Sequence, residues 1–200
     1  MTCKASGSPA VNPVSAMDFM PIDKLKTIQL ERLKFIVKRA YDNVPLFRSR
    51  LEERNLTPES ICTLEDIRKL PFTVKADLRD TYPFGLFASP MKEIVRLHAS
   101  SGTTGKPIVV AYTEEDIKTW SMAMVRSLAG CGIHEGDIAQ ISFGYGLFTG
   151  GLGAHYGFES LGATVIPASG GNTERQIMLM KDFGVICNSM RHHEDRRQHG

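Results

Sequence analysis

The 200-residue sequence lacks any long apolar run, and no stretch approaches the roughly 18 residues that a membrane-spanning helix needs. Its first residues do not contain the apolar segment of a secretory signal peptide. An excess of one charge is also missing, because 24 lysines and arginines oppose 22 aspartates and glutamates. Such a balanced chain is not typical of nucleic-acid-binding proteins. We therefore expect a cytoplasmic protein with neither a membrane nor a nucleic acid as its partner.

Cysteine is scarce, and none of the four cysteines forms a CxxC pair (Cys3, Cys62, Cys131 and Cys187). Free thiols in a reducing compartment are the expected state of such widely spaced cysteines. No Ser-His-Asp, zinc-ligand or paired-carboxylate pattern stands out, and no internal repeat is evident. The sequence therefore predicts no metal site within the chain. Its length and its 42% hydrophobic content are sufficient for a globular domain with a sizeable core.

Composition divides the chain into four predicted parts. Residues 1–17 are small and polar and predict a disordered N-terminus, and residues 18–90 predict a cap of helices and turns. Residues 91–187 predict an α/β region, and residues 188–200 form an atypical polar tail. That tail indicates a truncated or frame-shifted product. A metal site at His192, His193 and His199 is the alternative, although no scaffold is predicted to hold these side chains.

Hydrophobic periodicity and turn residues predict the order of the elements. A helix is expected over residues 22–41, and Thr63 and Thr113 begin two further helices, because acidic residues follow each threonine. Strands and helices then alternate, with strands over residues 138–142 and 163–166 and from residue 185, and helices over residues 149–161 and 173–184. This alternation of apolar strands with helices favours an α/β fold built from parallel β/α units.

A loop rich in hydroxyls and glycines lies between two strand-like runs, residues 94–97 and 108–112. Glycine lets backbone N–H groups converge on an anion, while hydroxyls and a lysine add donors and a positive charge. We expect this loop to bind a polyphosphate, with Lys106 as its catalytic cation. The expected contacts are Ser100, Ser101, Gly102, Thr103, Thr104, Gly105 and Lys106. The loop is not a Walker A motif, because Pro107 follows the lysine and a strand follows the proline. An ordinary hairpin turn with a solvated lysine is the alternative.

A second candidate site is the glycine- and aromatic-rich segment of residues 143–153, which leaves room for a flat ligand beside the backbone. The predicted pocket residues are Phe143, Tyr145, Gly146, Phe148 and Gly151. Tyr145 is the strongest candidate, because its hydroxyl needs a partner. Packing in the core is the alternative for each ring. For His98 and His155 we expect packing or hydrogen bonding. Residues 169–172 form either a further ligand-facing loop or a helix cap.

The loop of residues 97–107 resembles the phosphate loop of adenylate-forming enzymes, the acyl-CoA synthetase superfamily. Three further blocks, residues 70–87, 143–153 and 169–176, look like the phenylacetate–coenzyme A ligase branch, so that the resemblance covers about residues 20 to 187. It implies the N-terminal portion of the large domain of such an enzyme. It also implies ATP, Mg²⁺ and coenzyme A as cofactor and co-substrates, an aryl acid as substrate, and a homodimer, since family members often dimerise.

By the family pattern, the sequence lacks the later segment that helps hold Mg-ATP, the aspartate that binds ribose and the C-terminal domain with its lysine. The expected function is adenylation of phenylacetate or a related aryl acid, followed by thioester formation, and the 200 residues alone are expected to be inactive. The alternatives are a non-catalytic nucleotide- or acyl-binding remnant and an interaction module with an exposed sheet edge.

Overall fold

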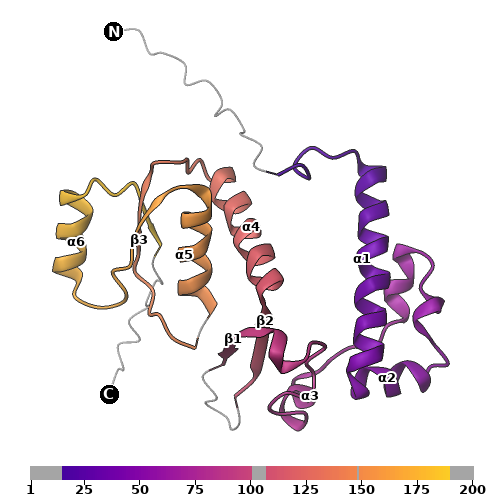
Figure 1. Ribbon diagram of the computed structural model, residues 1–200. Helices are drawn as coiled ribbons and strands as arrows, with labels where there is room; N and C mark the ends of the chain where they lie inside the picture. The colour runs from indigo at the N-terminus through magenta and orange to yellow at the C-terminus, as the bar shows by residue number, and fades with distance from the viewer. Residues whose placement is uncertain (1–14, 101–106, 148, 190–200) are drawn as a thin grey trace, which may run out of the picture. The chain divides into compact units, whose positions relative to one another are not determined.

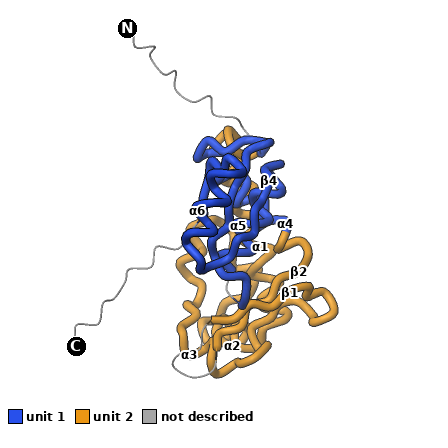
Figure 2. Tube along the Cα trace, turned by 90° about the vertical axis from the view of Figure 1, so that its left-hand side faces the viewer, with its two compact units in different colours: residues 1–15, 118–200 blue, residues 16–117 orange. Residues whose placement is uncertain are grey.

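The computed structural model describes residues 15–100, 107–147 and 149–189. The chain forms two compact units, one of residues 16–117 and the other containing residues 118–200 together with residues 1–15 (Figure 2). Residues 91–117, which the sequence analysis assigns to the α/β part, thus lie in the same compact unit as the N-terminal helices.

The unit of residues 16–117 is mostly helical. Helix α1 spans Ile22–Asn43, two residues beyond the predicted end, and α2 spans Pro45–Glu52 (Figure 1). The two are separated by Val44, whose extended backbone (φ −116°) follows from the proline after it. Short 3₁₀ turns at Pro58–Ser60, Leu64–Lys69 and Met91–Glu93 and helix α3 at Lys75–Asp80 complete the helices. Residues 18–90 therefore contain helices and turns, and their role as a cap stays a prediction.

Thr63 begins its turn as predicted, through a capping box with Asp66. The Asp66 carboxylate accepts the backbone N–H groups of Cys62 and Thr63 at 2.8 and 2.7 Å, and it pairs with Lys69 at 2.7 Å. These contacts, led by the hydrogen bond from Lys69, hold the pKa of Asp66 well below its usual range. A nearly buried carboxylate therefore fixes the geometry of this turn.

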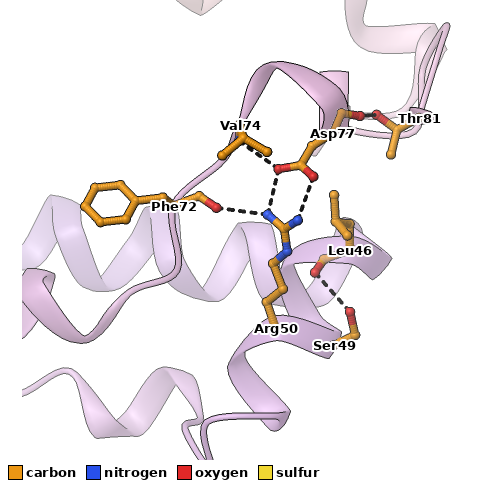
Figure 3. A network of polar contacts seen from close by, with 7 residues as sticks. All are labelled: Leu46, Ser49, Arg50, Phe72, Val74, Asp77 and Thr81. Carbon is orange, nitrogen blue, oxygen red and sulfur yellow. Dashed lines mark hydrogen bonds and ion pairs between the residues drawn. The ribbon is translucent and has the colours of Figure 1, made fainter. Parts of the chain in front are cut away.

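A second carboxylate joins α2 to α3. The Asp77 side chain accepts two hydrogen bonds from Arg50 and one from the backbone N–H of Val74, and Arg50 also donates to the carbonyl of Phe72 (Figure 3). The Asp77 residue is only 7% exposed. Its negative charge is thus fully matched by donors, as a buried charge requires.

Strands β1 (Ile94–Ala99) and β2 (Val109–Thr113) pair antiparallel in a sheet of their own. The predicted parallel arrangement therefore does not extend to the strands on either side of the loop. The reason is the connection: residues 100–108 are too few for a crossover that returns the chain in a parallel direction.

The unit of residues 118–200 contains the predicted parallel β/α units. Its sheet has the order β4-β3-β5, with β3 at Ile138–Ile141, β4 at Thr164–Ile166 and β5 at Cys187–Ser189. The helices are α4 at Glu114–Gly130, which begins at the end of the other unit, α5 at Thr149–Leu161 and α6 at Thr173–Asp182. The capping box of Thr113 with Asp116 and both ends of α5 agree with the prediction.

Strand β5 begins two residues later than predicted and includes Asn188 and Ser189 from the polar tail. Val185 is not in the strand, because its N–H bonds to Met180 at the end of α6 after Gly184 turns with φ +64°. The Ser142 N–H donates to the Ser189 carbonyl at 2.8 Å, which continues the pairing with the end of β3.

Helix α5 packs on the sheet and on α4 through different faces (Figure 1). Its Ala154 and Phe158 join Ala139, Ile141 and Ala163 in the buried core. On another face, a Cβ on Gly157 would lie 2.4 Å from Cβ of Met124, and a Cβ on Gly153 would lie 2.3 Å from the Trp120 ring. These two glycines therefore let α4 approach α5 more closely than any side chain would permit.

Candidate functional site

Ser100 closes the base of the predicted phosphate loop. Its N–H donates to the Ile108 carbonyl at 2.9 Å, and its Oγ accepts the Ile108 N–H, also at 2.9 Å. The second contact uses a lone pair of Oγ and leaves the hydroxyl hydrogen for another acceptor. Six predicted contacts lie outside the described residues: Ser101, Gly102, Thr103, Thr104, Gly105 and Lys106. Strands β1 and β2 thus form an antiparallel hairpin. The two hydrogen bonds between Ser100 and Ile108 join the strands at the end next to the loop.

The histidine before the loop is a packing residue. His98 is 2% exposed and makes an edge-on contact with the Tyr112 ring, with 5.6 Å between the ring centroids. The two side chains belong to paired strands, so this contact helps to hold β1 against β2. This position agrees with the packing or hydrogen-bonding role expected from the sequence.

The aromatic segment after β3 lies in the unit of residues 118–200. Phe143 and Tyr145 are half-buried and pack against the core, which agrees with the alternative that these rings are core residues. Each ring also keeps an exposed part. Gly146 is exposed, and Phe148 lies outside the described residues. Gly151 is buried in α5, where a Cβ would lie 3.0 Å from the carbonyl oxygen of Gly144. A side chain at that position would therefore displace the aromatic segment.

The Tyr145 hydroxyl finds its partner within the chain. Its oxygen lies 3.1 Å from Nδ1 of His155, and Nε2 of the same imidazole lies 3.0 Å from Oε1 of Glu159. Burial, followed by the charge of Glu159, raises the pKa of Tyr145 above its ordinary value. Sequence reasoning did not connect Glu159 with this site. The spacing of four residues between His155 and Glu159 on one predicted helix was the available signal.

Residues 169–172 cap helix α6. The Asn172 side chain accepts the Arg175 N–H at 3.1 Å, and Gln176 donates to the carbonyls of Ser169 and Gly171. Of the two interpretations of this segment, the described contacts are those of a helix cap. Among the described residues there is no group of three or more His, Cys, Asp or Glu side chains that could hold a metal ion. The described helices also include none that is long and apolar enough to cross a membrane.

No family model matches the chain, but several known proteins are similar to it in sequence. The chain is 58% identical over 167 residues to the phenylacetate-coenzyme A ligase of Pseudomonas putida, and 53% identical over 178 residues to that of Aromatoleum evansii. These matches cover 84% and 86% of this chain. Over most of its length, the chain is a relative of the phenylacetate–coenzyme A ligases. It spans 38% and 40% of the length of these two relatives.

The fold of this chain is also seen in solved structures of CoA ligases. An open conformation of 2-hydroxyisobutyryl-CoA ligase, in complex with 2-HIB-AMP and CoA, matches 89% of this chain with a TM-score of 0.78 and 26% sequence identity. The match covers 45% of the chain of that ligase. The α/β architecture is thus that of part of an adenylate-forming CoA ligase, as predicted from the sequence.

Proposed function

We propose that this chain provides the phosphate loop and part of the acid pocket of an ATP-dependent aryl acid–CoA ligase. The 58% identity with a phenylacetate-coenzyme A ligase over 167 residues carries this proposal. In the first step, a carboxylate oxygen of the acid attacks the α-phosphorus of ATP, and pyrophosphate leaves. In the second step, the thiol of coenzyme A loses its proton and attacks the acyl carbon, and AMP leaves. The products are the acyl thioester and AMP.

The first step accumulates negative charge on phosphate oxygens, which donors and cations held in place can stabilise. We assign hydrogen-bond donation to the hydroxyls of Ser100, Ser101, Thr103 and Thr104, and backbone access to Gly102 and Gly105. Lys106 supplies the positive charge beside the β- and γ-phosphates. The hydrogen bonds between Ser100 and Ile108 support this assignment, because they hold both ends of the loop together without using the Ser100 hydroxyl hydrogen.

For the acid pocket we propose Phe143, Tyr145, Gly146, Phe148 and Gly151. This segment follows the carboxyl end of β3, the part of a parallel sheet where α/β folds bind ligands. Half-buried rings offer edge-on or offset contacts to an aryl group. A Cβ on Gly146 would meet nothing within 4 Å, so the space beside this residue is open, and Gly151 of α5 packs tightly on Gly144. The ring of the acid would lie against Tyr145.

The reaction needs no general base for the acid, because a carboxylic acid is already ionised at neutral pH. The contacts of His98 with Tyr112 and of His155 with Glu159 support positioning roles for both imidazoles. Mg²⁺ would enter with ATP and neutralise phosphate charge, and we assign it no ligand among the described side chains. The proposal includes a cytoplasmic location, where ATP and coenzyme A are available, and a homodimer.

A test of the proposal is ATP–pyrophosphate exchange by the 200-residue chain with phenylacetate, run beside equilibrium binding of Mg-ATP and of phenylacetate. Because the chain spans 38% of its relative from P. putida, we propose that it binds these substrates without catalysing exchange. Exchange at an ordinary enzymatic rate would show that the chain is a complete catalyst. Absence of binding to both substrates would contradict the proposal and favour an interaction module, which light scattering would detect as an assembly.

A further inference from the structure

Helix α5 has a third face, distinct from those that contact the core and α4. It carries His155 and Glu159, four residues apart, and connects them to Tyr145 in the segment before the helix. The imidazole also makes edge-on ring contacts with Tyr145 and Tyr156, with centroids 5.7 and 5.5 Å apart. The His155 side chain is 21% exposed, so contacts on several sides restrict its rotation.

The direction of the hydrogen bonds follows from the chemistry of the three groups. A carboxylate only accepts hydrogen bonds, so the His155 Nε2 atom, 3.0 Å from Glu159, must carry a hydrogen. In a neutral imidazole, Nδ1 then has a lone pair and accepts the hydroxyl hydrogen of Tyr145 across 3.1 Å. The Tyr145 oxygen is left with lone pairs alone for any further partner.

We propose that Glu159, acting through His155, is a positioning residue that makes the Tyr145 hydroxyl a hydrogen-bond acceptor toward bound ligand. This inference rests on the proposed function, which places Tyr145 in the acid pocket. A hydrogen-bond acceptor at this position in the pocket repels the carboxylate of the acid, so Tyr145 contacts the aryl end of the acid. The Tyr145 oxygen also favours aryl acids that carry an O–H or N–H donor on the ring over unsubstituted ones, because a matched donor gains a hydrogen bond.

The first experiment reads the tautomer directly, without ligand and without activity. The chain is labelled with ¹⁵N-histidine, and the signals of His155 are identified by their loss in His155→Gln. At mildly alkaline pH we expect the hydrogen on Nε2 and a lone pair on Nδ1. In Glu159→Gln, whose amide can donate to Nε2, we expect a substantial population with the hydrogen on Nδ1. A hydrogen on Nδ1 in the unsubstituted chain would overturn the proposal.

The second experiment measures the ratio of the dissociation constants of phenylacetate and 4-hydroxyphenylacetate by equilibrium binding. The unsubstituted chain should favour the hydroxylated acid, and this preference should fall about fivefold in Tyr145→Phe and in Glu159→Gln, the value of one hydrogen bond. Glu174→Gln is the matched control, because it removes an exposed carboxylate from α6 and should leave the ratio unchanged. An unchanged ratio in Glu159→Gln would overturn the proposal. If the chain bound neither acid, the proposed function would fail, and the tautomer measurement would still decide whether Glu159, acting through His155, makes the Tyr145 hydroxyl an acceptor.

Discussion

Arg50 and Asp77 form a two-point ion pair, with Nη2 to Oδ1 at 2.6 Å and Nη1 to Oδ2 at 2.7 Å (Figure 3). The pair joins α2 to α3 across 27 residues of sequence. Such parallel hydrogen bonds depend on the planar fork of a guanidinium, which an ammonium group does not reproduce. The arrangement of the short helices in residues 45–80 therefore depends on the shape of the Arg50 side chain as well as on its charge.

Replacing Arg50 with lysine should lower the stability of the unit of residues 16–117, because one of the two hydrogen bonds to the nearly buried Asp77 is lost. Urea denaturation followed by circular dichroism measures the change as a lower transition midpoint. Arg68→Lys is the matched control, because Arg68 is exposed at the end of its 3₁₀ turn, and it should leave the midpoint unchanged. Equal midpoints for Arg50→Lys and Arg68→Lys would show that the two-point geometry contributes nothing.

Acid should destabilise the same unit through Asp66 and Asp77. Hydrogen bonds from Lys69 and Arg50, respectively, lower the pKa of these carboxyls in the folded chain. The resulting stabilisation is complete above their ordinary pKa of about 3.9 and is lost as the pH falls from there toward the lowered values. Asp66→Asn should therefore lower the denaturation midpoint at neutral pH and flatten its decline in acid. The exposed Asp80, changed to Asn, serves as control and should keep the slope of the unsubstituted chain.

Glycine at position 157 should be essential for the packing of α4 on α5. A Cβ there would overlap Cβ of Met124, an atom that cannot move without its backbone, so Gly157→Ala should destabilise the chain by about 1–3 kcal/mol. Gly150→Ala lies in the same helix, where an added Cβ meets nothing within 4 Å, and should be neutral or stabilising by about 0.5 kcal/mol. The thermal denaturation midpoint should thus fall in Gly157→Ala and stay equal or rise in Gly150→Ala. A loss of similar size in both would contradict the packing explanation, because alanine raises helix propensity and a Cβ on Gly150 has no close neighbour.

Lys106→Ala tests the proposed phosphate loop. Removal of one charge-assisted contact to a phosphate should weaken Mg-ATP binding by about tenfold or more while leaving phenylacetate binding nearly unchanged. Isothermal titration with each substrate separates the two effects. Lys92→Ala is the control, because Lys92 is an exposed lysine that lies in the turn just before β1. If Lys106→Ala weakened both substrates equally, the lysine would not act through the phosphates.

Local signals in the sequence predicted most of the elements. Pro45 ends α1, Thr113 with Asp116 begins α4, and Gly184 follows the end of α6, because each effect acts within a few residues of backbone. The same restriction to neighbouring residues explains why β5 was predicted to begin two residues too early. Val185 has the apolar character of a strand residue, but its N–H is taken by the end of α6.

The candidate site was only partly accessible to the same reasoning. The sequence predicted Tyr145 and a partner for its hydroxyl, and it placed Ser100 in the loop. It did not identify His155 as that partner or the Ile108 N–H as the donor to Ser100, because each contact depends on how the chain folds back over eight or ten residues. The roles of both segments in catalysis stay predictions.

The sequence by itself determined the alternation of helices and strands and the loop chemistry, since hydrophobic periodicity, caps and glycines are properties of neighbouring residues. Only the tertiary structure decided that β1 and β2 form a sheet separate from the parallel one, that Arg50 meets Asp77, and that Glu159 reaches Tyr145 through His155. The physical reason is the same in each case. A contact between residues far apart exists only when packing has fixed the path of the chain between them.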